Sequence, residues 1–159
     1  QGRLGRNGGR NAAAMAYGCM SSSTLPFPVT QNTALDAYEL MFAPWVKQLG
    51  LRDFTVDDRR ITARLPLDDA LKFSSGAVCG QAIMAAIDTI TSMAMMTGDR
   101  PTKGTIYQHT HFLRPARDDD FFIEASVLRF GKATAYAEAR VTFAASGELV
   151  AHAVLEFAF

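Results

Sequence analysis

The amino-acid sequence predicts an α+β domain in which an antiparallel sheet wraps around one long central helix. Residues 79–96 are apolar around most of a helical circumference, and such a helix needs protein on nearly every side. After a break that contains glycine and proline, four strand-like runs follow, at residues 105–113, 120–130, 133–144 and 148–159. Short turns join these runs, so we expect an antiparallel meander whose buried face covers the helix.

Chain length, charge and cysteine content limit the classes of protein that fit. A chain of 159 residues is long enough for one domain with a sizeable core. Its 16 lysines and arginines balance 16 aspartates and glutamates, so no overall field draws it to nucleic acid or to an anionic membrane. Cys19 and Cys79 belong to no metal-binding pattern, and no apolar run reaches the length of a membrane span. We therefore expect a cytoplasmic protein whose partner is a small molecule.

The N-terminal part of the chain differs in composition from the rest. Its first 20 residues are rich in glycine, arginine and asparagine and lack an acidic residue, which is typical of disorder. We predict that residues 1–32 form a disordered or weakly ordered extension and that residues 33–159 form the folded domain. A non-native remnant or an upstream start explains residues 1–20 at least as well as a targeting peptide does, with Met15 and Met20 as plausible starts.

The segment before the apolar helix is predicted to contain one helix and one hairpin. The spacing of apolar residues such as Leu35 and Trp45 predicts a helix over residues 34–49, with Thr33 as its N-cap and Gly50 as its stop. Alternating apolar and polar side chains then predict a β-hairpin, with strands at residues 51–56 and 59–65.

Asp88 is the one carboxylate within the apolar helix. Burying an unpaired carboxylate is costly, so Asp88 needs either dedicated hydrogen-bond partners or a place at a cleft where chemistry happens. The sequence leaves both interpretations open. Thr91, Ser92 or a partner helix could satisfy the carboxylate in a purely structural role.

Several motifs give the chain a family resemblance when their order and spacing are taken together. In chain order they are Gly76, Gly80 and Asp88, then Phe112-Leu113-Arg114-Pro115-Ala116, then Gly131-Lys132. With these motifs, residues 34–159 resemble the hotdog-fold acyl-CoA thioesterases, particularly the phenylacetate-degradation-type branch of the 4-hydroxybenzoyl-CoA thioesterase superfamily. The resemblance implies a hotdog fold, an acyl-CoA substrate, no metal or redox cofactor, and a homodimer or dimer of dimers.

The resemblance also implies which residues act. Gly80, at the start of the helix, would offer its backbone N–H to the thioester oxygen, and Asp88 would act as general base or nucleophile. Thr105 would orient a water molecule. Nine residues of helix span roughly 13 Å, so Gly80 and Asp88 would serve one site only if each came from a different protomer. Arg114 and Lys132 are candidates for binding the phosphates of coenzyme A.

The chain departs from the family pattern where the chemistry would be. Phe73, Cys79 and Gln81 stand where the family has asparagine, histidine and glycine. We expect all three to line the substrate site. Gln81 either replaces a lost hydrogen-bond donor or fills space left for an acyl chain, and Phe73 narrows the entrance. Cys79 could be a nucleophile at a helix start, but no histidine is placed to serve it, and buried cysteines are common.

The three histidines of the chain offer a weaker signal. His109 and His111 share one face of a strand and, with His152, could supply three imidazoles to a zinc ion. Paired or half-exposed histidines of this kind are more often ordinary sheet residues, so we expect no metal.

Two functions from different classes fit the sequence. The first is an acyl-CoA thioesterase-like hydrolase that cleaves a small or aromatic acyl thioester to the free acid and coenzyme A. The alternative is a non-catalytic acyl-CoA or lipid-binding hotdog protein, in which the altered turn around Phe73, Cys79 and Gln81 has lost turnover. A hotdog hydratase is disfavoured, because the acid and histidine that it would require are not visible.

Overall fold

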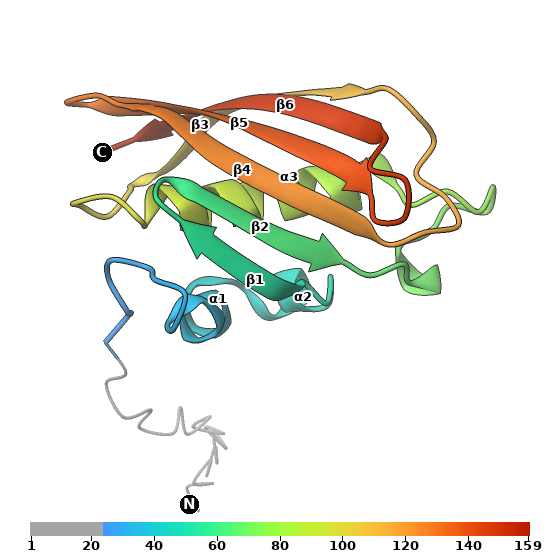
Figure 1. Cartoon of the computed structure of the whole chain (residues 1–159), viewed down its shortest axis with the longest axis horizontal. Helices are drawn as coiled ribbons and strands as arrows, with labels where there is room; N and C mark the ends of the chain where they lie inside the picture. The colour runs from blue at the N-terminus through green and yellow to red at the C-terminus, as the bar shows by residue number, and fades with distance from the viewer. Residues whose placement is uncertain (1–23) are drawn as a thin grey trace, which may run out of the picture.

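The computed structural model describes residues 24–159, which form a curved antiparallel sheet over one long helix (Figure 1). The six strands are β1 (Arg52–Asp57), β2 (Arg60–Leu65), β3 (Gly104–Phe112), β4 (Phe121–Phe130), β5 (Thr134–Phe143) and β6 (Leu149–Ala158). The helices are α1 (Ala34–Met41), α2 (Pro44–Lys47) and α3 (Gly80–Met95), with a short 3-10 helix at Asp69–Leu71. The α+β class and the central helix predicted from the sequence are confirmed.

The core forms between α3 and the concave face of the sheet. Ile83, Ile87 and Ile90 on the predicted apolar stripe are at most 2% exposed, and burying each side chain contributes about 1.5–3 kcal/mol. Many of the buried residues of the strands are alanines, which allow the sheet to approach the helix closely. They include Ala63, Ala125, Ala135, Ala137, Ala139, Ala151 and Ala153.

The order of the strands differs from the predicted meander. The sheet runs β1-β2-β4-β5-β6-β3, so of the four strands expected in the meander only β4, β5 and β6 are neighbours in sequence order. β2 takes the place beside β4, where Ile61 pairs with Ala125. β3 must therefore cross to the other side and pair with β6, with His111 opposite His152. This correction matters for function, because β3 becomes an edge strand with one side of its backbone unpaired within the protomer.

The predicted helix over residues 34–49 is wrong in its continuity. α1 ends at Met41, and α2 begins separately at Pro44 after Ala43 adopts an extended backbone conformation. Proline disfavours helical geometry in the residue before it and fits the first turn of a new helix, which explains the break. Leu35 and Trp45, which contributed to the helical spacing, are each 60% exposed.

The boundaries of this region agree better with the sequence. Gly50 stops the helical segment with φ of +68°, a conformation that glycine adopts without strain. Thr33 is the residue before α1, but its hydroxyl accepts a hydrogen bond from Thr30 N–H (3.0 Å) and does not cap the helix. The predicted hairpin is confirmed, and Ile61 and Leu65 point into the core.

Residues 24–32 pack against the domain in part. Val29 is buried, and its N–H donates to Met96 O at the end of α3 (2.8 Å). The rest of the predicted extension, residues 1–23, lies outside the described part of the chain, as does Cys19. No helix among residues 24–159 is both long and apolar enough to cross a bilayer.

Candidate functional site

One stripe of α3 is left uncovered by the core, and it marks the candidate site. Its members recur at helical spacing and are exposed or half-buried, whereas their neighbours are buried; they are Gln81, Met84, Ala85, Asp88 and Ser92. Thr91, which the sequence offered as a possible partner of Asp88, is buried instead. The stripe lies along β3, where Gln108 Nε2 donates to Met84 O (3.2 Å).

Asp88 meets Thr105 in the middle of this stripe. The Thr105 hydroxyl donates to Asp88 Oδ1 across a distance of 2.5 Å. Such a short O–H···O contact is typical of a hydroxyl that donates to a carboxylate. Within residues 24–159, no hydrogen bond of Asp88 to Thr91 or Ser92 is present, and Thr91 donates to Ile87 O (2.7 Å). The carboxylate is therefore held by the edge strand, with Oδ2 left available.

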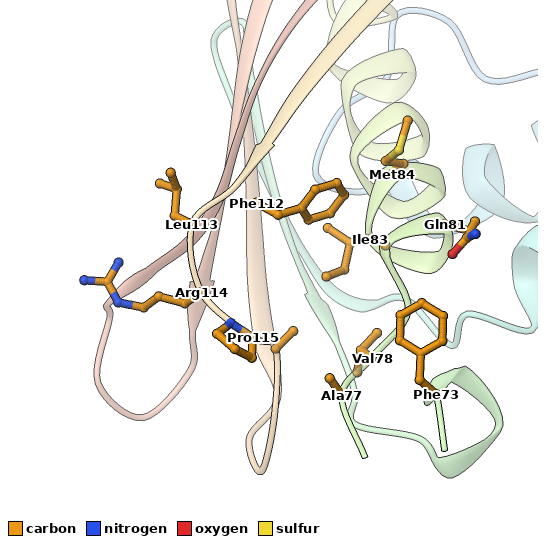
Figure 2. Close-up of a pocket in the computed structure, with 12 residues that line it drawn as sticks. Phe73, Ala77, Val78, Gln81, Ile83, Met84, Phe112, Leu113, Arg114 and Pro115 are labelled. Carbon is orange, nitrogen blue, oxygen red and sulfur yellow. The ribbon is translucent and has the colours of Figure 1, made fainter. Parts of the chain in front are cut away.

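A cavity of about 630 Å³ opens where the start of α3 faces the end of β3. Figure 2 shows Phe112 pointing from the strand toward Ile83 on the helix, with Phe73 on the other side of the opening. The lining is almost entirely apolar, and Gln81 and Arg114 are its polar side chains. A cavity of this size and character suits an apolar group of moderate size.

Gly80 supplies the polar element at the bottom of this cavity. It is the first residue of α3, and Ala82 and Ile83 are the first residues whose N–H groups bond back to Cys79 O. The N–H groups of Gly80 and Gln81 have no backbone acceptor within residues 24–159. Two unpaired amides at the positive end of a helix can polarise a carbonyl oxygen that approaches them.

Gln81 lies between this cavity and a second one. A smaller cavity of about 330 Å³ is lined by Trp45, Leu71, Cys79 and Gln81, so Gln81 borders both cavities. Cys79 itself lies outside the larger cavity, at the N-cap position of α3. Among the three departures from the family pattern, Phe73 and Gln81 therefore face the main opening.

The two cationic candidates for coenzyme A lie in different places. Arg114 is at the cavity, but Figure 2 shows its side chain pointing away from α3. It donates to Leu149 O (2.7 Å) and lies 3.6 Å from Glu148. Lys132 is exposed in the turn between β4 and β5, next to Gly131, whose carbonyl accepts a hydrogen bond from Arg100 beyond the far end of α3. Within one protomer, Lys132 is therefore remote from the cavity.

The three histidines do not come together as a zinc triad. His109 and His111 contact each other, while His152 Nε2 lies 3.4 Å from Glu138 Oε2. Among the described residues, no group of three or more histidines, cysteines or carboxylates is arranged to hold a metal ion.

Comparisons with known proteins agree with this architecture. Residues 75–150 match the family model described as the thioesterase superfamily. The segment includes Gly80, Asp88, Thr105 and the end of β3. No curated protein sequence matches the chain.

Solved structures extend the likeness to most of the chain. Thioesterase superfamily member 2 of zebrafish superposes with a TM-score of 0.75 at 21% identity, covering 82% of this chain and 98% of that one. A conserved protein of Pseudomonas aeruginosa gives 0.68 at 26% identity, with 76% and 96% covered. The PaaI protein of the E. coli phenylacetic acid degradation operon gives 0.71 at 19% identity, with 80% and 90% covered.

The chain thus has the hotdog fold, and within it residues 75–150 match the thioesterase superfamily. The hotdog fold that the sequence motifs implied is confirmed, with α3 as the helix around which the sheet wraps.

Proposed function

We propose that the protein is an acyl-CoA thioesterase of the phenylacetate-degradation type, which hydrolyses a small or aromatic acyl thioester to the free acid and coenzyme A. The observation that carries the proposal is the contact between Thr105 and Asp88 on the uncovered stripe of α3. A carboxylate whose orientation is fixed by a strand hydroxyl, and which keeps one oxygen available, suits a general base for water.

The site requires two protomers. Gly80 and Asp88 lie on the same helix, eight residues apart, which corresponds to roughly 12 Å along its axis. A second copy that pairs its β3 with this β3 would continue the sheet and bring its own α3 alongside. In the resulting dimer, the N–H groups of Gly80 and Gln81 in one protomer face Asp88 of the other, and two equivalent sites form.

The reaction then follows from these groups. The thioester carbonyl oxygen accepts hydrogen bonds from the free N–H groups of Gly80 and Gln81, and its acyl group occupies the apolar cavity. Asp88 Oδ2 takes a proton from a water molecule, whose oxygen attacks the carbonyl carbon. The amides stabilise the negative charge that develops on the carbonyl oxygen. Collapse of the tetrahedral intermediate breaks the C–S bond and releases coenzyme A as a thiol after proton transfer from Asp88.

Two substitutions test this assignment with little change of shape. Asp88→Asn keeps the hydrogen bond from Thr105 but removes the base, so thiol release from phenylacetyl-CoA and from short acyl-CoA esters should fall about 10²–10⁴-fold. Asp118→Asn is the matched control, because Asp118 is an exposed carboxylate in a turn with positive φ, which asparagine tolerates. Equal turnover by parent and Asp88→Asn proteins would disprove the role of Asp88.

A specific observation favours one alternative, an acyl-CoA-binding protein without turnover. Phe112 lies against Gly80 and Phe73 lines the opening, so bulky rings flank the amides that would bind the carbonyl. This alternative predicts that acyl-CoA raises the melting temperature of the parent protein while no thiol is released over hours. Measurable hydrolysis that depends on Asp88 would reject it.

A further inference from the structure

The exposed side of β3, away from α3, carries a pair of histidines with unusual geometry. His109 and His111 are both exposed, and their Nε2 atoms lie 3.1 Å apart. The ring centroids are 4.4 Å apart, and the ring planes meet at 69°. Residues two apart on a strand point to the same side, so the backbone places the two imidazoles on one face, where their side chains can meet.

The separation of the two nitrogens matches the bite of a chelate. A Zn²⁺ ion binds imidazole nitrogen at about 2.0–2.1 Å. With an N–Zn–N angle between about 90° (square) and about 109° (tetrahedral), the two nitrogens therefore lie roughly 2.9–3.4 Å apart. The pair already has this spacing. Because both side chains are exposed, rotation about their side-chain bonds is enough to aim both lone pairs at one ion.

We propose that His109 and His111 form a two-imidazole site for a divalent first-row transition ion such as Zn²⁺, Ni²⁺ or Cu²⁺, with water in the remaining positions. Imidazole suits these ions, whereas Mg²⁺ and Ca²⁺ prefer oxygen ligands. The site is separate from the uncovered stripe of α3 that contains Asp88, and it does not rest on the proposed hydrolase activity.

The surroundings explain why the protein supplies two ligands. Val154 stands opposite His109 in β6 and contributes no donor, while His152 stands opposite His111 but contacts Glu138. Glu138 adds a nearby negative charge that favours a cation, and Arg140, the neighbour of His152 in β5, opposes it. The outcome is an open, exchangeable site rather than a closed structural one.

Calorimetric titration of the untagged full chain with ZnCl₂ and with NiCl₂ tests the site. One ion per chain should bind to the parent. His109→Ala and His111→Ala should each weaken binding at least roughly tenfold, the loss typical of removing even an outer partner of a metal ligand. The double variant should be no weaker than either single variant, because each single variant already destroys the chelate.

His152→Ala is the control, and its affinity should stay close to that of the parent. Single variants that bind as tightly as the parent would overturn the proposal, and so would an equal loss in His152→Ala. Anomalous scattering from zinc-soaked crystals gives an independent readout, with the ion expected within about 2.1 Å of both Nε2 atoms. The proposal would also be contradicted by an ion located elsewhere on the chain. A crystal in which His109 and His111 share only a hydrogen bond, with no ion between them, would contradict it as well.

Discussion

The ring of Phe112 occupies the space that a side chain at position 80 would need. A Cβ atom built on Gly80 would lie 3.1 Å from Phe112 Cζ, closer than ordinary carbon contacts allow. Glycine at this position therefore lets the end of β3 pack directly on the start of α3. The same contact sets the distance between the aromatic wall of the cavity and the free amides of the helix.

Gly80→Ala should consequently impair the site more than the fold. The added methyl group pushes the Phe112 ring away or tilts the first turn of α3, so hydrolysis should fall while the melting temperature changes little. The double variant Gly80→Ala with Phe112→Leu relieves the contact and should recover part of the lost rate. A Gly80→Ala protein with parental kcat/KM would show that the contact does not position the amides.

Gln81 is expected to limit the length of the acyl group. It borders the cavities of about 630 Å³ and 330 Å³, so Gln81→Gly should join them and shift the preference in kcat/KM toward longer acyl-CoA esters. Each additional methylene that becomes buried contributes about 0.8 kcal/mol, or roughly fourfold. Met84→Ala is the comparison, because Met84 lines only the larger of the two cavities. An identical chain-length profile for parent and Gln81→Gly would reject this role.

A charge on the edge strand should disrupt the proposed dimer. Ile106 on β3 is 56% exposed, and Ile106→Lys would bring two like charges together where two β3 strands pair. In sizing chromatography at micromolar concentration, the apparent mass should then fall from that of the dimer toward 17.3 kDa, the mass of one chain. Thiol release should be lost with it. Leu128→Lys is the control, since Leu128 is similarly exposed (57%) but lies on β4, which has a neighbouring strand on each side and is not an edge strand. A monomeric and fully active parent protein would contradict the shared site.

The core should be most sensitive at the centre of α3. Ile87 is 0% exposed, so Ile87→Ala should lower the free energy of unfolding by about 2–5 kcal/mol, through lost burial and the cavity left behind. Leu35→Ala, at a 60% exposed position, should change it by less than about 0.5 kcal/mol. Urea denaturation measures both values. Similar losses in the two variants would mean that α3 is not the centre of the core.

Much of the fold was predictable because its signals are local. The buried face of α3, the β1–β2 hairpin and the lengths of β4, β5 and β6 follow from hydrophobic periodicity, which a chain shows within one segment. The break at Pro44 was also visible in the sequence and was missed because apolar spacing outweighed the proline. The position of β3 beside β6 was not visible, since it depends on β2 having taken the place next to β4.

The candidate site was predictable only through the family resemblance. Spacing alone left Asp88 with several possible partners, and the structure pairs it with Thr105, the hydroxyl that the resemblance pointed to. Phe112 was named as part of a motif, but its contact with Gly80 is a long-range packing relationship that no sequence period records. The closeness of the His109 and His111 nitrogens likewise depends on side-chain rotation, which the spacing of two residues permits but does not dictate.

The place of β3 makes β6 indispensable to residues that lie far before it in the sequence. Within the protomer, β3 is held in the sheet by β6 alone, from Gly104 opposite Ala158 to Phe112 opposite Ala151. A truncated product that stopped before Leu149 would still contain Gly80, Asp88 and Thr105, yet the strand that carries the threonine would have no strand to pair with. Synthesis has to pass through β6 before those three residues can assume their arrangement, so termination before Leu149 should yield a protein that carries every proposed active residue and releases no thiol.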